Sequence, residues 1–464
     1  MQTAVLRKRI WGWFFFDWAS QPYHTLLVTF VFGPYFAAVA TQHFMGTGLP
    51  EQAADARAQS LWSMGLTVPS LVVGLGGPVL GALADAAGRR RPWIIVFSAL
   101  CVLGSGSLWW VMPDGSNLAF GLIAFGIGFI GAELALIFTN AQLPSLGPTK
   151  EIGKISGSGY AFGYLGGLVS LVIMLALFLE QASGTTIAGL APALGLDPAA
   201  REGTRFVGPF AAVWFAAFMI PYFLWVREEQ ALRKRTPAVE SLTHLLDRLR
   251  ALPRRPSLAS FLGGSMLYRD GLNGLYAFGG TYAVLVLNWE ITQVGIFGII
   301  GLISAAVLSW IGGGLDRRFG PKPVITLCVL ALIVVCVTIM SVRPDSIFGL
   351  PVAAVCGASG AMCQNLPQLV FMACGALIGG LGGILQAASR TLMVRHANPD
   401  TATEDFGLYG LAGRATSFLA PLLIGIVTAM SGSVALGMTP IIVLFASGAV
   451  LLRWTEPDGD RAET

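Results

Sequence analysis

The stretch Gly81-Ala82-Leu83-Ala84-Asp85-Ala86-Ala87-Gly88-Arg89-Arg90-Arg91-Pro92 lies between two long apolar runs, residues 61–80 and 93–112. It combines one acid, a glycine that permits a tight turn, and consecutive arginines. A weaker copy follows at 312–323, where Asp316, Arg317 and Arg318 precede Gly320. In that copy the glycine stands four residues after the acid, against three in the first. The repeat predicts a chain with two similar halves.

The composition is that of a membrane protein. Of the 464 residues, 55% are hydrophobic and only 12% are charged, and the mean hydropathy is +0.70. A soluble domain carries about 25% charged residues, so lipid must cover much of this apolar surface. The net charge of +4 resides in short clusters between apolar runs. That arrangement is typical of membrane topology signals and excludes a nucleic-acid-binding protein.

Twelve stretches are long and apolar enough to cross a bilayer, which takes about 20 residues in a helix. The first contains Asp17 and Pro22 and is too long for the apolar core of a signal peptide, so we interpret it as a retained helix. The predicted spans are 11–40, 60–86, 92–112, 117–146, 153–180, 206–227, 257–288, 291–315, 322–342, 365–394, 404–431 and 436–454.

The basic residues predict the orientation. If the N-terminus is inside, most of the 29 Lys and Arg residues fall in inside segments, among them 7–9, 89–91 and the polar stretch 228–256. Such an asymmetry predicts a multi-pass protein of the inner membrane with both termini cytoplasmic. We therefore expect an all-α fold with two pseudo-symmetric six-helix bundles, residues 1–227 and 257–464, joined by a cytoplasmic linker at 228–256. The basic linker is suited to anionic lipid headgroups.

The repeated motif suggests a latch. A carboxylate at a helix end can accept hydrogen bonds from arginines or from the N-terminus of a neighbouring helix. Such a contact can hold the cytoplasmic helix ends together in one state and release them in another. The simpler alternative is that the arginines only fix topology. The predicted gate residues are Asp85, Gly88, Arg89, Arg90, Asp316 and Arg317.

Several polar side chains interrupt the apolar segments. Charges inside a membrane are costly and normally face a cavity or a partner. Because burial favours the neutral form of a carboxyl group, Glu133 is a candidate proton carrier, and a structural ion pair with Arg269 is the alternative. His24 is suited either to packing against its neighbours or to relaying a proton. The candidate substrate or proton contacts are Glu133, Arg269, Asp270, Asp17, His24, Asn140 and Gln386.

The sequence lacks the signatures of an enzyme. It contains no P-loop, no metal-ligand spacing and no nucleophile motif, so we expect no cofactor and no bound metal. Residues 126–131 fit a dinucleotide-binding glycine pattern but lie inside an apolar helix with no preceding strand. The six cysteines are expected to pack as small apolar residues. A disulfide between Cys356 and Cys363 is the alternative for one pair.

Four further stretches carry a family resemblance. They are 11–19 (WGWFFFDWA), 159–167 (GYAFGYLGG), Tyr268-Arg269-Asp270-Gly271, and 383–390 (GILQAASR) with 406–414 (FGLYGLAGR). With the motif at 81–92, they resemble the major facilitator superfamily, and within it the vacuole-effluxer-like branch related to a fungal autophagy-associated amino-acid exporter. The resemblance implies export of amino acids such as leucine and tyrosine. The chain departs from the family pattern at 20–24 and in the long region 343–363.

The prediction is therefore a monomeric secondary transporter in membrane lipid that moves a small molecule by rocking around a central cavity lined by helices 1, 4, 7 and 10. Proton coupling and an amino acid or similar zwitterion are the first hypothesis. A carrier of drugs, sugars or lipid-like amphiphiles is the alternative within the fold. A membrane sensor or scaffold is the alternative of another class, although the longest polar segment, 228–256, is short for a signalling domain.

Overall fold

The computed structural model describes residues 2–181, 183–227, 243, 247, 250, 252–287, 289, 291–352, 366–398, 401–413, 416, 419–431 and 433–459. Most of the expected linker at 228–256 lies outside these residues, as do Cys356 and Cys363. The four described cysteines are free and buried. They are Cys101, Cys328, Cys336 and Cys374.

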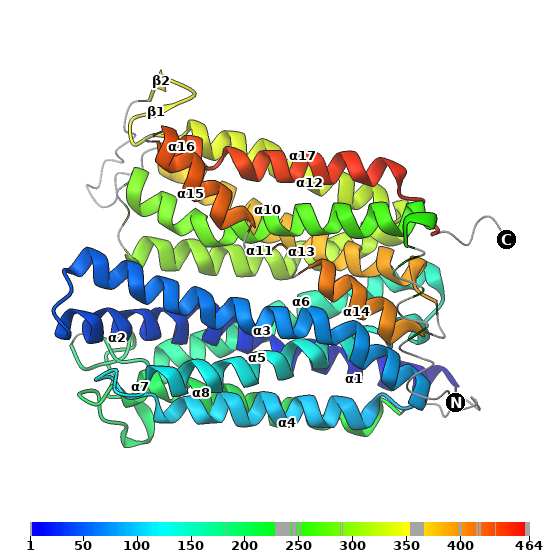
Figure 1. Cartoon of the computed structure of the whole chain (residues 1–464), viewed down its shortest axis with the longest axis horizontal. Helices are drawn as coiled ribbons and strands as arrows, with labels where there is room; N and C mark the ends of the chain where they lie inside the picture. The colour runs from blue at the N-terminus through cyan, green and yellow to red at the C-terminus, as the bar shows by residue number, and fades with distance from the viewer. Residues whose placement is uncertain are drawn as a thin grey trace. The chain divides into compact units, whose positions relative to one another are not determined.

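The described elements are almost all α-helices, as Figure 1 shows. A short antiparallel hairpin of β1 (Ser346–Ile347) and β2 (Leu350–Pro351) is the exception. The helices are α1 (Gln2–Pro22), α2 (Phe32–Gly46), α3 (Glu51–Ala87), α4 (Arg91–Ser107), α5 (Leu118–Asn140), α6 (Thr149–Ile173), α7 (Glu202–Arg205), α8 (Val207–Trp225), α10 (Pro256–Leu287), α11 (Ile291–Phe319), α12 (Pro321–Ser341), α13 (Leu366–His396), α14 (Ala402–Ala412), α15 (Leu419–Ser431), α16 (Val434–Gly437) and α17 (Thr439–Leu451).

The all-α membrane class is confirmed. Within the described residues, ten helical stretches are long and apolar enough to cross a membrane. The two other predicted spans correspond to α10, which carries Arg269 and Asp270, and to the pair α14 and α15. Prolines near the helix starts, such as Pro92 in α4 and Pro321 in α12, fit because the first helical turn needs no backbone donor.

Two predicted spans are divided, which the apolar pattern did not indicate. The first, 11–40, consists of α1, a π-helix at Tyr23–Phe30, and α2. The break falls at Val31, whose φ and ψ are −124° and −67°. Pro34 explains why a new helix, α2, begins here. Its ring would clash with the preceding turn of a continuous helix, but it fits in the first turn of a new one. The span 404–431 is likewise divided into α14 and α15.

The chain forms two compact units. Unit 1 comprises Met1–Leu146, Phe162–Leu245 and Pro399–Leu411, and unit 2 comprises Gly147–Ala161, Leu246–Asn398 and Ala412–Thr464. In unit 1, α4 packs on α5 and α8, α1 packs on α8, and α3 packs on α2 and α5. In unit 2, α11 and α12 pack on α13, and α10 packs on α17. Each unit thus includes a short segment from the other half of the sequence. The division into bundles 1–227 and 257–464 stays a prediction.

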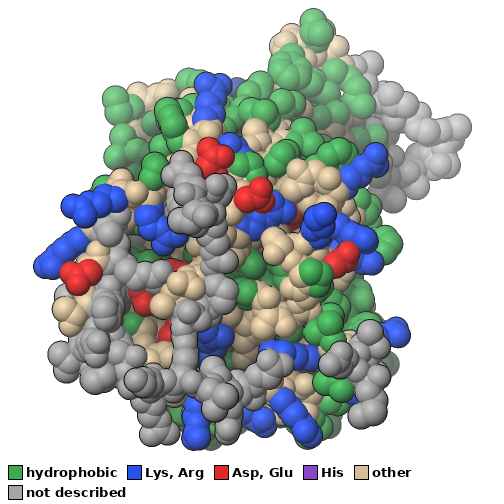
Figure 2. All heavy atoms as spheres, turned by 90° about the vertical axis from the view of Figure 1, so that its right-hand side faces the viewer, with side chains coloured by type: hydrophobic (Ala, Val, Ile, Leu, Met, Phe, Trp, Pro, Cys, Tyr) green, Lys and Arg blue, Asp and Glu red, His purple; other side chains and the backbone are tan. Residues whose placement is uncertain are grey.

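Each unit has a basic end, defined here by the helix termini that carry Lys and Arg. In unit 1, Arg9 donates to the Ser145 hydroxyl at 2.8 Å, and Arg91 donates to the Phe223 carbonyl at 2.9 Å. In unit 2, Lys322 donates to the Arg453 carbonyl at 3.3 Å. Figure 2 shows Lys and Arg side chains gathered among such helix ends. Arg91 and Lys322 therefore satisfy carbonyl groups near helix ends.

Two aromatic residues of the first predicted span are buried in the core of unit 1. The Trp13 ring is fully buried, and its indole N–H donates to the Thr139 carbonyl at 3.0 Å. Tyr35 is also buried and donates to the Val111 carbonyl at 3.1 Å. Each has found a backbone acceptor that the sequence pattern does not show. Trp110 is 57% exposed, as an interfacial residue would be.

Glycines allow α4 and α5 to touch along their backbones. A Cβ placed on Gly131 would lie 2.5 Å from the Cys101 nitrogen and 2.6 Å from the Phe97 carbonyl oxygen. Neither neighbour is the end of a flexible side chain, so neither can move aside. By contrast, a Cβ on Gly76 of α3 would meet only the Leu80 side chain, at 3.8 Å.

Gly131→Ala is therefore expected to destabilise the protein by about 1–3 kcal/mol, the usual cost of overpacking a tight contact. The melting temperature of the full chain in detergent measures this. Gly76→Ala is the matched control, and we expect it to be neutral or slightly stabilising because alanine is the better helix former. Equal melting temperatures for both variants would contradict this account of the packing.

Candidate functional site

Asp85, at the end of α3, joins two other segments of unit 1. Its Oδ1 accepts from the Arg90 guanidinium at 2.9 Å and from the Thr403 hydroxyl at 2.7 Å. Its Oδ2 accepts from the backbone nitrogens of Thr403 and Glu404, at 2.9 and 3.1 Å. Both nitrogens lie in the first turn of α14, where helical N–H groups have no partner within the helix. The carboxylate therefore caps α14 and meets the positive end of its dipole.

The other residues of the motif serve this contact. Gly81 lies against α14, since a Cβ there would be 2.6 Å from the Thr403 carbonyl oxygen. Gly88 ends α3 with φ +64°, a conformation that favours glycine. The turn brings Arg90 back to Asp85, and Arg90 also donates to the Ala141 carbonyl at 3.4 Å. Arg90, rather than the exposed Arg89, is thus the partner of the acid.

The second copy is built differently. Asp316, near the end of α11, faces the first turns of α6, where a Cβ on Gly153 would lie 2.8 Å from its Oδ2. Its neighbour Arg317 forms an ion pair with Glu151 of α6 at 3.0 Å. Both acids therefore contact the segment that the other half of the sequence contributes to their unit. Gly320, with φ +83°, makes the turn into α12.

In unit 1, His24 and Glu133 are neighbours. His24 lies in the π-helix after α1, and Glu133 is 5% exposed in the middle of α5. The His24 Nε2 and Glu133 Oε1 atoms are 3.7 Å apart, within ion-pair range but longer than a hydrogen bond. The adjacent Tyr23 hydroxyl donates to the Phe125 carbonyl of α5 at 2.8 Å and fixes the two helices together. π-Helical turns occur often at functional sites.

Asp17 and Asn140, also in unit 1, are both buried, at 7% and 8% exposure. The Cβ of Asp17 faces Gly163 of α6, where an added Cβ would lie 3.2 Å away. Asn140 ends α5, one residue after the carbonyl that accepts the Trp13 N–H. Gln142, two residues further on, accepts from the Tyr222 hydroxyl at 2.9 Å. These residues connect α1, α5 and α8 near the basic end.

In unit 2, Arg269 and Asp270 of α10 lie beside the division between α14 and α15. The Arg269 guanidinium packs on Gly413, so closely that a Cβ there would clash with it. Asp270 is fully buried, and neither of its oxygens accepts a hydrogen bond from the part of the chain that the structure describes. Thr416 and Arg269 are polar groups that face it. Because Glu133 belongs to unit 1, its pairing with Arg269 stays a prediction.

Gln386 of α13 interacts with the Tyr276 hydroxyl of α10. One turn further along α13, Arg390 is 1% exposed. Its Nη2 donates to the Ser156 carbonyl at 2.8 Å, and its guanidinium lies 4.2 Å from the centre of the Tyr160 ring. Arg390 is not among the candidate site residues that the sequence indicated. Its position within an apolar stretch, four residues after Gln386, was the signal that it faces protein.

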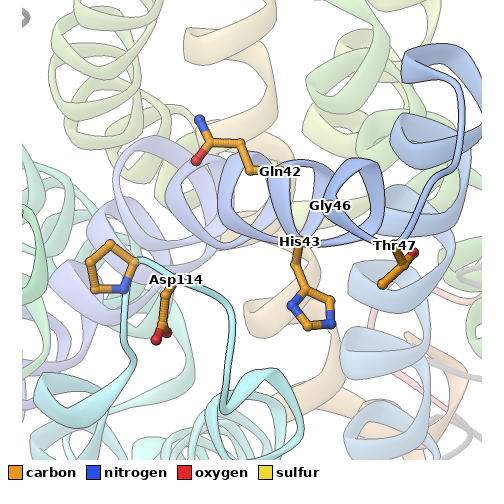
Figure 3. Close-up of a pocket in the computed structure, with 6 residues that line it drawn as sticks. Gln42, His43, Gly46, Thr47 and Asp114 are labelled. Atoms are coloured by element: carbon orange, nitrogen blue, oxygen red, sulfur yellow. The ribbon is translucent and has the colours of Figure 1, made fainter.

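A shallow hollow lies at the other end of unit 1, as Figure 3 shows. It is separated from Arg90 by the length of α5, about 35 Å at 1.5 Å per residue. His43 of α2 and Asp114 of the loop before α5 line one side of it. Asp114 accepts from the Ser116 nitrogen at 3.0 Å, a contact that lowers the pKa of its carboxyl. Within the described residues no cluster of His, Cys, Asp and Glu could hold a metal ion.

The fold is shared with known transporters. The chain superposes on the proton:xylose symporter XylE, bound to 6-bromo-6-deoxy-D-glucose, with a TM-score of 0.72 at 13% identity over 100% of both chains. It also superposes on the human organic anion transporter MFSD10 with a TM-score of 0.67 at 18% identity, over 96% of this chain and 99% of the other. These likenesses establish the major facilitator fold.

The sequence comparisons identify the family. An uncharacterized MFS-type transporter of Bacillus subtilis (strain 168), YxiO, is 23% identical over 444 residues, which is 95% of this chain and 93% of the relative. Residues 6–463 match the family described as vacuole effluxer Atg22 like. The chain therefore belongs to the vacuole effluxer Atg22-like family, and it is a transporter of the major facilitator type rather than an enzyme.

Proposed function

We propose that the protein is a proton-coupled secondary transporter that moves a small zwitterion, with amino acids as the first candidates. The observation that carries the proposal is that each unit buries an acid beside a base within its apolar helices. These are Glu133 with His24 in unit 1, and Asp270 with Arg269 in unit 2. Charged side chains within a membrane are energetically costly, and they commonly mark the pathway of a substrate or an ion.

The proton is assigned to Glu133. Its carboxyl group lies in α5 and is 5% exposed, and the His24 imidazole lies 3.7 Å away as an alternative base. Protonation of either group removes or creates a charge at the junction of α5 with the π-helix. A coupling ion needs such a group, whose charge changes between the two accessible states.

The substrate is assigned to the unit 2 pair. Guanidinium groups bind carboxylates through two parallel hydrogen bonds, and a carboxylate binds an ammonium group. Arg269 and Asp270 therefore offer both charges that a zwitterion needs. Asp270 retains acceptor capacity, since neither oxygen accepts a hydrogen bond from the described residues. Superposition on a sugar symporter and on an organic anion transporter supports the fold. It does not indicate the substrate of this chain.

The two aspartates at the basic ends are assigned to the gate. Asp85 caps α14 and is held by Arg90, so these bonds must break if α14 moves away from α3. We also propose that the basic ends of both units face the cytoplasm, with the protein in the inner membrane. The excess of Lys and Arg at these helix termini supports this orientation.

Glu133→Gln is expected to abolish uphill accumulation while leaving exchange, because the amide keeps the shape of the side chain but carries no proton. Proteoliposome uptake with and without a pH gradient measures this, across a panel of leucine, tyrosine, sugars and amphiphiles. Glu51→Gln, at the exposed start of α3, is the control. Unchanged uphill transport by Glu133→Gln would exclude the coupling role. Uptake of only sugars or amphiphiles would favour the alternative substrate classes.

Asp85→Asn is expected to slow turnover about tenfold while leaving KM nearly unchanged. The substitution weakens charge-assisted bonds worth about 1.5–3 kcal/mol each, and 1.4 kcal/mol corresponds to a factor of ten in rate. Concentration-dependent uptake separates kcat from KM. Asp114→Asn, in the exposed loop before α5, should leave both unchanged. Normal turnover of Asp85→Asn would remove the gate assignment.

A reporter fused at residue 240, in the expected linker, should report the cytoplasm, and one inserted at residue 114 should report the opposite side. The reason is that most Lys and Arg residues stay on the inside. A phosphatase and fluorescent-protein pair gives both readings. Reversed signals would overturn the orientation and leave the fold unaffected.

A further inference from the structure

The two aspartates of the repeated motif have opposite hydrogen-bond states. Asp85 accepts from Arg90, from the Thr403 hydroxyl and from two backbone nitrogens of α14. Asp316 is 2% exposed, and neither of its oxygens accepts a hydrogen bond from the described residues. A buried carboxylate without hydrogen-bond donors pays a large desolvation cost that a neutral carboxyl group avoids. The first site is therefore built for an ionised group, and the second for a neutral one.

The groups around Asp316 explain why it lacks donors. From α6, the backbone of Gly153 lies against the carboxyl. From α13, the Thr391 hydroxyl lies close enough to interact with the carboxyl, but its single proton is donated to the Ala387 carbonyl at 3.1 Å. Arg317, the next residue in α11, is directed to Glu151, with 3.0 Å between Nε and Oε1.

The cation that interacts with Asp316 is Arg395 of α13. Its Nη1 donates instead to Asp458, at 2.9 Å, and to the Pro457 carbonyl, at 3.2 Å, both in the C-terminal segment. Asp458 is an exposed acid. The guanidinium also lies beside the turn at Gly320, where a Cβ would be 3.7 Å from Nη1. The remaining charged residues nearby, Lys154 of α6 and Arg318 of α11, are exposed.

We propose that the Asp316 carboxyl is a proton-binding site that holds a proton while α6 packs against it and releases that proton when Arg395 becomes its partner. The proton comes from water at the basic end of unit 2 and returns there. The C-terminal segment competes for Arg395 through Asp458, so it favours the protonated form. This site is separate from the proposed coupling group Glu133, and only its consequence for gating rests on the proposed function.

Infrared difference spectra of the full-length protein in lipid nanodiscs, recorded between acidic and alkaline pH, test the proposal. A protonated carboxyl gives a C=O stretching band that the carboxylate lacks. We expect Asp316→Asn to remove one component of this band and Asp85→Asn to leave it intact. Identical spectra for wild type and a folded Asp316→Asn would overturn the proposal. The measurement needs no substrate, so a failure here is distinguishable from a failure of the transport assignment.

Two variants at a distance from the carboxyl keep the test independent of folding at residue 316. Asp458→Asn frees Arg395 and should move the titration midpoint of that component down by about half a pH unit, since an exposed ion pair contributes about 0.2–1 kcal/mol and one unit is 1.36 kcal/mol. Arg395→Gln should move the midpoint up. Opposite shifts support the site. A midpoint that neither variant moves, or that both move in one direction, would overturn it.

Discussion

The capping of α14 by Asp85 is the interaction on which the basic end of unit 1 depends. A single carboxylate satisfies the first turn of a helix that is distant in sequence, and it binds the arginine that follows the α3–α4 turn. The close approach requires Gly81, and the return of Arg90 requires the positive φ of Gly88. The acid, the glycines and one arginine of the motif therefore act as a single device. Under the proposed gate, α14 can move away from α3 only when these hydrogen bonds break.

The same motif at the end of α11 yields a different chemistry because its surroundings differ. There the acid meets the Gly153 backbone in the second turn of α6 instead of the donors of a first turn, and its neighbour Arg317 forms an ion pair with Glu151. A repeated motif can thus keep its aspartate at the same place in the helix while the hydrogen-bond donors that stabilise a carboxylate are absent. Under the proposals above, the contact at Asp85 opens by breaking charged hydrogen bonds, and the contact at Asp316 opens by a change of protonation. The free energy needed to open the Asp85 contact can therefore differ from that needed to open the Asp316 contact.

The sequence was sufficient for the fold class, the family and most helix positions, because a long apolar run has few other solutions in a membrane. It indicated arginines or a helix N-terminus as partners of Asp85, but it could not say that both bind it or that α14 supplies the terminus. It could not show that the backbone carbonyls of Thr139 and Val111 accept hydrogen bonds from the buried Trp13 and Tyr35 side chains. Such partners lie far away in the chain and leave no local pattern. The contacts of Arg390 leave no local pattern either, since Ser156 and Tyr160 are more than 200 residues before it.

The irregular helices and the buried charges coincide, and this coincidence is the strongest link from structure to transport. His24 lies in the π-helix that follows Pro22, and Arg269 packs against Gly413 where α14 gives way to α15. Irregular backbone inside a membrane leaves polar groups unpaired, so it persists only where it faces protein or a water-filled path. A continuous helix would be cheaper at both places. The helices of this chain are therefore interrupted near buried charged side chains. Discontinuous helices line the substrate and ion sites of many secondary transporters in the same way.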